Sequence, residues 1–236
     1  MRTILHNSFY ENRMNEYIDH TVLKPDATMK DIAKLCKESQ EYKFASVCIA
    51  PAWVDYCKLL LHSFSEPTPI ATVIGFPHGN TTEKSKYREI KYATEDGATE
   101  HDVVINIGDV KSGSWSSIKK EIRKIATTKN TEWGQQNSIL IKYIVEVGYL
   151  TDDELFKIAD LLIKHEIDYI KTCTGYGPRG VTVEDIIKIK RHVGDAIKIK
   201  ASGGIKTADF AKQLVMAGAN RIGCSASVSI MNELKK

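Results

Sequence analysis

The feature that most constrains the fold of this chain is a regular alternation of short apolar stretches with longer amphipathic ones. Eight short stretches can be marked, at intervals that mostly fit one strand and one helix: Tyr17–Leu23, Ala45–Ala50, Ile70–Gly75, Asp102–Ile107, Ile139–Val147, Tyr169–Thr174, Ile197–Ser202 and Arg221–Cys224. Strands that are apolar on both faces are typical of a parallel sheet covered by helices. The alternation therefore predicts an α/β protein.

The amphipathic segments between these stretches begin with residue patterns that are typical of helix N-termini. Three of them open with a hydroxyl residue and an acid three positions later, namely Thr28-x-x-Asp31, Thr151-x-x-Glu154 and Thr182-x-x-Asp185. In this pattern the hydroxyl caps free N–H groups and the acid reaches back to the cap. Apolar residues recur behind each cap at helical spacing. A fourth segment begins at Thr207 and ends at Gly218, because glycine commonly follows the last turn of a helix.

Eight such units within 236 residues favour a closed (β/α)8 barrel, also called a TIM barrel. A doubly wound open sheet is the alternative, which is weakened because no GxGxxG fingerprint follows the first strand. No linker or change in composition divides the chain, so we expect one domain over residues 1–236. Its first part, residues 1–16, is expected to form a short helix or arm over one end of the barrel.

Composition excludes several classes of protein. The chain is 42% hydrophobic and 27% charged, and its 33 basic and 30 acidic residues are spread along the sequence, which argues against a nucleic-acid surface. No stretch approaches the roughly 18 apolar residues of a membrane helix. The five cysteines and seven histidines show no metal-ligand spacing. We expect reduced thiols and a cytoplasmic location.

Lysines occur inside three of the predicted strands, where lysine is depleted. Lys171 and Lys200 are 200 − 171 = 29 residues apart, which suits one helical crossover between neighbouring parallel strands. Alternation gives Asp102 a common face with Val104 and Asn106, and Lys142 a common face with Ile144 and Glu146. With all three lysines and Asp102 turned inward, the barrel would have a charged floor.

Two interpretations of this charged floor remain. The lysines and acids could form compensating ion pairs, but a buried set of this kind seldom improves stability over apolar packing. Alternatively, they carry chemistry, because a second ammonium group and partial burial both favour the neutral amine that acts as a nucleophile. A reactive amine suits imine formation with an aldehyde or ketone, and Asp102 is then a natural proton-transfer group.

Small residues follow the last two predicted strands, in Ser202-Gly203-Gly204 and Gly223-Cys224-Ser225. Backbone N–H groups at these two loops form the usual phosphate site of a barrel. Either loop alone is weak evidence, because glycines after strands also make plain turns. Together they favour phosphate binding, with Gly175 and Lys206 as further contributors.

These stretches resemble the deoxyribose-phosphate aldolase family, the lysine-dependent aldolases of deoxynucleoside breakdown. The likeness covers nearly the whole chain, in the segments Tyr17–Pro25, Thr72–Gly79, Asp102–Gly108, Tyr169–Gly175, Ile199–Ile205 and Arg221–Gly223. It implies a (β/α)8 barrel with no metal and no organic cofactor. It also implies that Lys171 forms the Schiff base, Lys200 perturbs Lys171, and Asp102 belongs to the proton relay.

The resemblance also assigns residues to substrate binding. Positions that line the family's substrate pocket are occupied here by Asp19, Thr21, Cys48 and Lys142, with Thr174 and Lys206 nearby. The substrate phosphate would lie on Gly175, Gly203, Gly204, Gly223 and Ser225. Two segments depart from the family pattern, the residues after Ser225 and the loop Tyr176–Gly180, and both concern phosphate affinity more than carbonyl chemistry.

The implied activity is reversible cleavage of 2-deoxy-D-ribose 5-phosphate to D-glyceraldehyde 3-phosphate and acetaldehyde. Three alternatives stay open: a lysine aldolase for another sugar phosphate, a non-catalytic sugar-phosphate-binding barrel, and, least favoured, a divalent-metal aldolase. The expected partners are small molecules, with no nucleic acid and no membrane. A monomer and a homodimer both fit.

Overall fold

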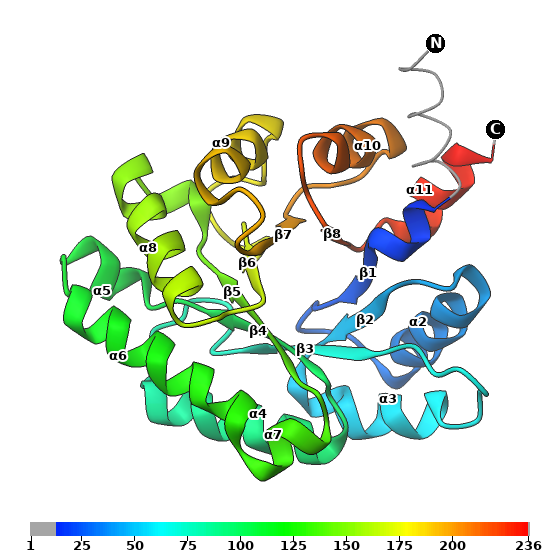
Figure 1. Cartoon of the computed structure of the whole chain (residues 1–236). Helices are drawn as coiled ribbons and strands as arrows, with labels where there is room; N and C mark the ends of the chain where they lie inside the picture. The colour runs from blue at the N-terminus through cyan, green and yellow to red at the C-terminus, as the bar shows by residue number, and fades with distance from the viewer. Residues whose placement is uncertain (1–12, 236) are drawn as a thin grey trace.

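The computed structural model, which describes residues 13–235, is a closed barrel of parallel strands surrounded by helices (Figure 1). Each strand pairs with the next, and the last pairs with the first. The strands are β1 (Ile18–Val22), β2 (Ser46–Ile49), β3 (Ile70–Ile74), β4 (Glu100–Val104), β5 (Leu140–Ile144), β6 (Tyr169–Lys171), β7 (Lys198–Ser202) and β8 (Arg221–Cys224). The predicted (β/α)8 barrel is confirmed, and the open-sheet alternative is wrong.

Helices cover the outside of the barrel between successive strands (Figure 1). The α-helices are α2 (Met29–Tyr42), α3 (Val54–Leu61), α4 (Glu83–Asp96), α5 (Ile107–Lys111), α6 (Trp115–Ala126), α7 (Glu132–Gln136), α8 (Asp152–Lys164), α9 (Val183–Val193), α10 (Ala208–Met216) and α11 (Ser227–Leu234). Short 3-10 helices are η1 (Met14–Tyr17), η2 (Pro51–Trp53), η3 (Thr127–Asn130) and η4 (Val147–Tyr149). All three predicted capping boxes form, at the starts of α2, α8 and α9.

The ends of two strands differ from the sequence prediction. β4 starts at Glu100 instead of Asp102 and ends at Val104, so Asn106 does not share its inner face with Asp102. Asn106 instead caps α5, where its Oδ1 accepts a hydrogen bond of 3.3 Å from the Asp109 N–H. Glu146 likewise lies beyond β5, in left-handed backbone at φ 56°. The predictions of a shared strand face are therefore wrong for Asn106 and Glu146, because the chain has left the strand before each of them, and hold for Val104 and Ile144.

The predicted N-terminal arm falls mostly outside the described residues. Its described part contains η1, whose Met14 side chain is fully buried. Asn15 ties this turn to the segment before β2, because its side-chain amide donates to the Lys43 carbonyl at 3.0 Å. Between residues 13 and 235, no helix combines the length and apolar character needed to cross a membrane.

Inward-facing side chains of the strands form layers of four that come from alternate strands, as strand register in a barrel requires. The first layer, nearest the N-terminal ends of the strands, consists of Ser46, Glu100, Tyr169 and Arg221. The second layer consists of Asp19, Ala71, Lys142 and Lys200. The third layer consists of Cys48, Asp102, Lys171 and Gly223. Branched apolar residues dominate such layers in most barrels. Here charged residues replace them.

Candidate active site

Asp102, in the third layer, is the centre of the charged floor. Its Oδ1 accepts a hydrogen bond from Lys142 Nζ at 2.9 Å. Its Oδ2 accepts from Lys171 Nζ at 2.7 Å and from Lys200 Nζ at 2.6 Å. The parallel register produces this arrangement, since Lys142 is the partner of Asp102 across β4 and β5, and Lys171 is the partner of Lys200 across β6 and β7. The structure therefore brings the four predicted residues together.

A second carboxylate, Asp19 of the second layer, joins the second layer to the first. It forms an ion pair with Lys200, and its Oδ1 accepts from Arg221 Nη1 at 2.5 Å. Glu100 completes the cluster through ion pairs of 2.6 Å with Lys142 and 3.4 Å with Arg221. The charged residues thus form one connected network across the barrel interior.

The charges in this network shift the pKa values of Asp102, Asp19 and Lys200. Burial favours the neutral form of Asp102, but the lysines Lys142, Lys171 and Lys200 outweigh burial and keep its pKa well below the usual range. For Asp19 as well, burial is outweighed by Lys200, Lys142 and Arg221, so its pKa is lowered. Burial alone would lower the pKa of Lys200, yet Asp102 and Asp19 raise it.

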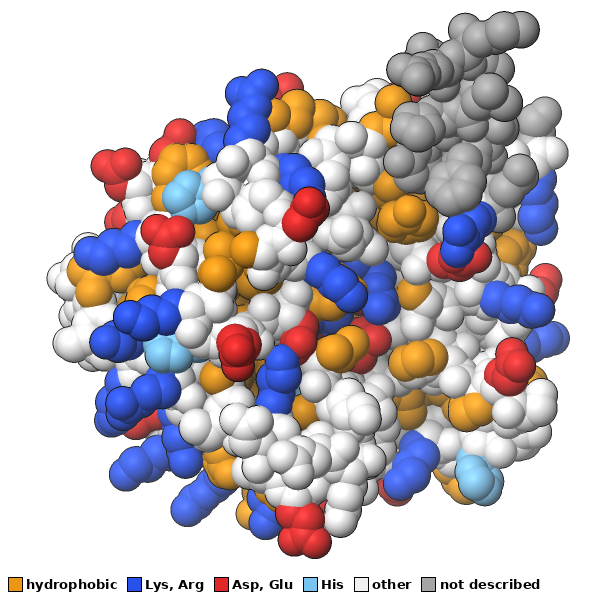
Figure 2. Space-filling model, viewed as in Figure 1, with side chains coloured by type: hydrophobic (Ala, Val, Ile, Leu, Met, Phe, Trp, Pro, Cys, Tyr) orange, Lys and Arg blue, Asp and Glu red, His pale blue; other side chains and the backbone are white. Residues whose placement is uncertain are grey.

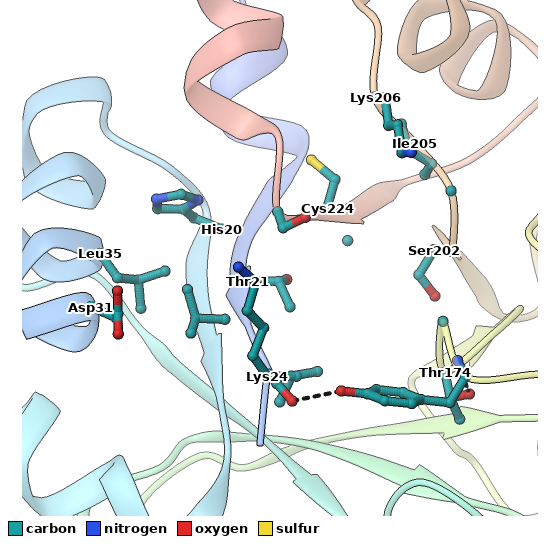
Figure 3. A pocket seen from close by; sticks show the side chains of 18 of the residues that line it. His20, Thr21, Lys24, Asp31, Leu35, Thr174, Ser202, Ile205, Lys206 and Cys224 are labelled. Atoms are coloured by element: carbon teal, nitrogen blue, oxygen red, sulfur yellow. Dashed lines mark hydrogen bonds between the residues drawn. The ribbon is translucent and has the colours of Figure 1, made fainter. Parts of the chain in front are cut away.

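A cavity of about 530 Å³ opens above the third layer at the C-terminal ends of the strands. The predicted site residues that line it are Thr21, Lys171, Thr174, Gly175, Gly203, Gly204, Lys206, Gly223 and Ser225. Figure 3 shows Thr174, Ser202 and Lys206 on the side of the cavity opposite Thr21 and Lys24. The side chain of Lys171 is 4% exposed, so it is the lysine of the network that reaches this space.

Three residues predicted to line the pocket are instead fully buried beneath it. Asp19, Cys48 and Lys142 are each 0% exposed. The reason is their depth in the barrel, because Asp19 lies two residues before Thr21 on the same strand face and therefore two layers lower. Cys48 Sγ lies 3.8 Å from Asp102 Oδ2, and burial raises the pKa of this thiol. These residues can act on Lys171 only through the network.

The loops after β6, β7 and β8 together form one wall of the cavity. Gly203 has φ 95°, and a Cβ there would lie 2.9 Å from Cys173 Cβ, so this position requires glycine. α11 follows β8 directly after Ser225 and Ala226, which is where barrels commonly place a short phosphate-binding helix. Lys24, Lys34 and Lys206 also line the cavity. Figure 2 shows Lys and Arg side chains near acidic ones over the middle of the viewed face.

Sequence reasoning missed four residues near the site. Glu100 precedes the stretch marked as a strand, and Arg221 was noted only as part of a motif, although each lies two residues before an inward-facing position. Glu146 accepts hydrogen bonds from Thr174, including one of 3.0 Å from its N–H. Tyr176 donates to the Leu23 carbonyl at 2.9 Å across the cavity mouth.

Arg179, in the loop that departs from the family pattern, does not face the cavity wall as a free cation. Its guanidinium makes a two-pronged contact with the Asp185 carboxylate, at 2.6 and 2.9 Å. Asp185 also caps α9 by accepting from the Thr182 N–H at 2.9 Å. The arginine therefore fastens the loop to the start of the helix.

This fold and this site, a lysine at the mouth of a (β/α)8 barrel above a buried aspartate, define the aldolase class of barrel enzymes. A family model described as DeoC/LacD family aldolase matches residues 13–230. The chain belongs to this family and is a lyase.

Relatives and solved structures agree with this assignment. The chain is 45% identical over 219 residues to a deoxyribose-phosphate aldolase of Thermoanaerobacter sp., covering 93% of this chain and 96% of the relative. It is 46% identical over 214 residues to one of Desulfitobacterium hafniense, covering 91% and 95%. The structure of a tetrameric deoxyribose phosphate aldolase from Aeropyrum pernix superposes with a TM-score of 0.86 at 27% identity, covering 96% and 92%.

Proposed function

We propose that the protein reversibly cleaves 2-deoxy-D-ribose 5-phosphate to D-glyceraldehyde 3-phosphate and acetaldehyde through a Schiff base on Lys171. The observation that carries this proposal is the position of Lys171. Its Nζ contacts Asp102 at 2.7 Å, and its side chain lines the cavity, whereas Lys142 and Lys200 are 0% exposed. A substrate aldehyde in the cavity can therefore reach only this amine of the three.

Charge balance and access to the cavity together favour Lys171 as the lysine that reacts. Within residues 13–235 the network contains three carboxylates, Asp19, Glu100 and Asp102, and four basic groups, Lys142, Lys171, Lys200 and Arg221. The network becomes neutral when one basic group loses its proton. A guanidinium does not lose its proton in proteins, and adjacent carboxylates raise the pKa values of both Lys142 and Lys200. Lys171 is the remaining base.

The reaction then follows from the positions of Lys171 and Asp102. Lys171 Nζ attacks C1 of the open-chain sugar, and loss of water gives an iminium ion. Removal of the proton from the 3-hydroxyl breaks the C2–C3 bond, whose electrons pass into the iminium to give an enamine and release glyceraldehyde 3-phosphate. Protonation of the enamine at C2 and hydrolysis release acetaldehyde and restore the amine. Asp102 Oδ2 is within hydrogen-bond reach of Lys171 Nζ, where we expect it to move protons directly or through water.

The wall of the cavity that is formed by the loops after β7 and β8 suits the phosphate. The β7–α10 loop with Gly203 and Gly204, and Ser225 before α11, present backbone to the cavity, and Lys206 adds a cation. A phosphate held there orients the sugar with its C1 end toward the third layer. This orientation is part of the proposal.

Trapping of the covalent intermediate tests the mechanism. With acetaldehyde and borohydride, Lys171 should carry an N-ethyl group in place of one hydrogen, a net gain of C2H4, and Lys171→Met should abolish both trapping and turnover. Lys84→Met, which removes an exposed lysine on α4, is the matched control and should keep both. An adduct on another lysine, or none, would contradict the mechanism. Acetaldehyde release from a panel of phosphorylated and free sugars tests the substrate.

We also propose a cytoplasmic location for the protein. The five cysteines are all free and buried, which fits a reducing compartment. The Aeropyrum pernix relative is tetrameric by its description, whereas the sequence of this chain fits both a monomer and a homodimer. Light scattering at several concentrations would distinguish a homodimer from a monomer and a tetramer.

A further inference from the structure

We infer that Glu100 and Arg221, the charged pair of the first layer, are positioning residues that set the pH at which Lys171 becomes reactive, with opposite effects on that pH. Neither residue touches the cavity, so neither contacts substrate. This inference rests on the proposed role of Lys171 as the nucleophile, and it goes beyond that role by extending the site to the far end of the barrel.

The contacts form a chain from the first layer to the third. Arg221 donates to Asp19 at 2.5 Å, and Asp19 pairs with Lys200, which donates to Asp102 at 2.6 Å. On the other side, Glu100 pairs with Lys142 at 2.6 Å, and Lys142 donates to Asp102 at 2.9 Å. Both chains end on Asp102, whose Oδ2 also accepts from Lys171.

Burial of the charged first-layer pair lowers the stability of the barrel relative to apolar side chains of similar size. Glu100 is 4% exposed and the side chain of Arg221 is 12% exposed, and charges removed from water to this extent cost more than apolar residues of similar size. Arg221 and Glu100 are 3.4 Å apart, which is too long for a strong ion pair, whereas each makes a contact of 2.5–2.6 Å to the second layer. Each of the two side chains therefore makes a shorter contact with a second-layer residue than with its first-layer partner.

Net charge gives the two residues opposite effects. Without the Glu100 charge, the network holds more positive charge around Lys171, so Lys171 should lose its proton at lower pH. Without the Arg221 charge, the three remaining basic groups are balanced by three carboxylates, so Lys171 should keep its proton to higher pH. A role confined to packing would not give shifts of opposite sign.

Other titratable groups around the charged network come from most of the packed strands. Beyond the network itself, β2 contributes Cys48, β4 contributes His101 on its outer face, and β6 contributes Tyr169. Burial lowers the pKa of His101 to about 3, so it stays neutral near pH 7. β7 contributes the exposed Lys198, whose Nζ lies 5.5 Å from the Tyr169 ring centre, and β8 contributes Cys224. The inward positions of β3 are apolar.

The test is the acid limb of the kcat/KM profile, which reports ionisation of the free enzyme. Glu100→Gln should move its midpoint to lower pH and Arg221→Gln to higher pH, each by roughly 1 pH unit. Glu100→Asp and Arg221→Lys keep the charges and should keep the midpoint near that of the wild type. The matched control is Lys198→Gln, which removes an exposed cation at the same end of the barrel and should leave the midpoint unchanged.

The pH dependence of borohydride trapping with acetaldehyde gives a second readout that does not depend on turnover. The inference is overturned if wild-type Lys171 is trapped but the two variants shift in the same direction or not at all. If wild-type Lys171 is not trapped, the proposed function itself fails. Circular dichroism establishes that each variant is folded; where Arg221→Gln does not fold, the comparison of Glu100→Gln with Glu100→Asp decides, and equal midpoints for those two overturn the inference.

Discussion

Glu146 shows how a single residue outside the charged network can hold the site in place. It follows β5 in left-handed backbone, which is uncommon for a residue other than glycine, and its side chain is 1% exposed. One carboxylate oxygen of Glu146 accepts hydrogen bonds from both the backbone N–H and the hydroxyl group of Thr174, which lies three residues after Lys171. The carboxylate therefore fixes the first residues of the loop that follows β6.

Glu146→Gln is expected to weaken this anchor. A neutral amide oxygen accepts two hydrogen bonds less strongly than a carboxylate, so the free energy of unfolding should fall by about 1–3 kcal/mol. Because Thr174 lines the cavity, kcat/KM should fall as well. Urea unfolding and steady-state kinetics measure the two effects. The exposed Glu184→Gln on α9 is the control, and equal stability losses for the two variants would remove the special role of Glu146.

At the scale of elements, the loop between β6 and α9 is tied to its surroundings by several hydrogen bonds and an ion pair. Thr174 binds Glu146, Tyr176 reaches across the mouth to the Leu23 carbonyl, and Arg179 pairs with Asp185 at the start of α9. The Tyr176 ring also meets Phe76 edge-on, with ring centres 5.5 Å apart. The hydrogen bond at Tyr176 thus joins this loop to the loop after β1.

Tyr176→Phe removes that hydrogen bond and keeps the ring contact. We expect KM to rise a few-fold with a smaller change in kcat, because about 1 kcal/mol of loop fixation is lost before the substrate binds. Hydrogen–deuterium exchange of residues 175–181 should speed up in the free enzyme. Tyr149→Phe, at a half-exposed tyrosine after β5, is the control. Unchanged exchange in Tyr176→Phe would show that the bond does not restrain the loop.

Element types were predictable from sequence where the signal is local. The capping boxes at Thr28, Thr151 and Thr182 form as expected, because hydroxyl and acid are only three residues apart. Strand ends were less predictable, because register with neighbouring strands decides them. Glu100 looks like a polar residue before a strand, yet its pairing with Leu140 across β4 and β5 makes it the first residue of β4.

For the whole molecule, predictability depends on how many strands separate two residues. The proximity of Lys171 and Lys200 followed from the length of one crossover. The contact of Asp102 with both of them requires the register of β4 through β7, and the contact of Arg221 with Asp19 requires the barrel to close between β8 and β1. No local pattern encodes that closure, which is why the first layer was missed.

The same network should determine the stability of the whole barrel toward acid and base. The pKa values of Asp19 and Asp102 are lowered in the folded state, so their contribution is present above the unfolded value of about 3.9 and is lost as pH falls below it. The pKa of Lys200 is raised, so its contribution is present below about 10.4 and is lost as pH rises above it. From this network we expect a plateau of stability between those limits.

Asp102→Asn isolates the acid side of this plateau. The difference in unfolding free energy between wild type and variant should grow as pH rises from about 3 to about 5, by at most about 1.4 kcal/mol per pH unit, because only the wild-type carboxylate becomes ionised and paired. Urea unfolding at each pH measures it, and the exposed Asp55→Asn, expected to change stability by less than about 0.5 kcal/mol, is the control. A wild-type advantage of the same size at every pH would mean that Asp102 stabilises the barrel by packing alone, since a packing contact does not respond to the proton concentration.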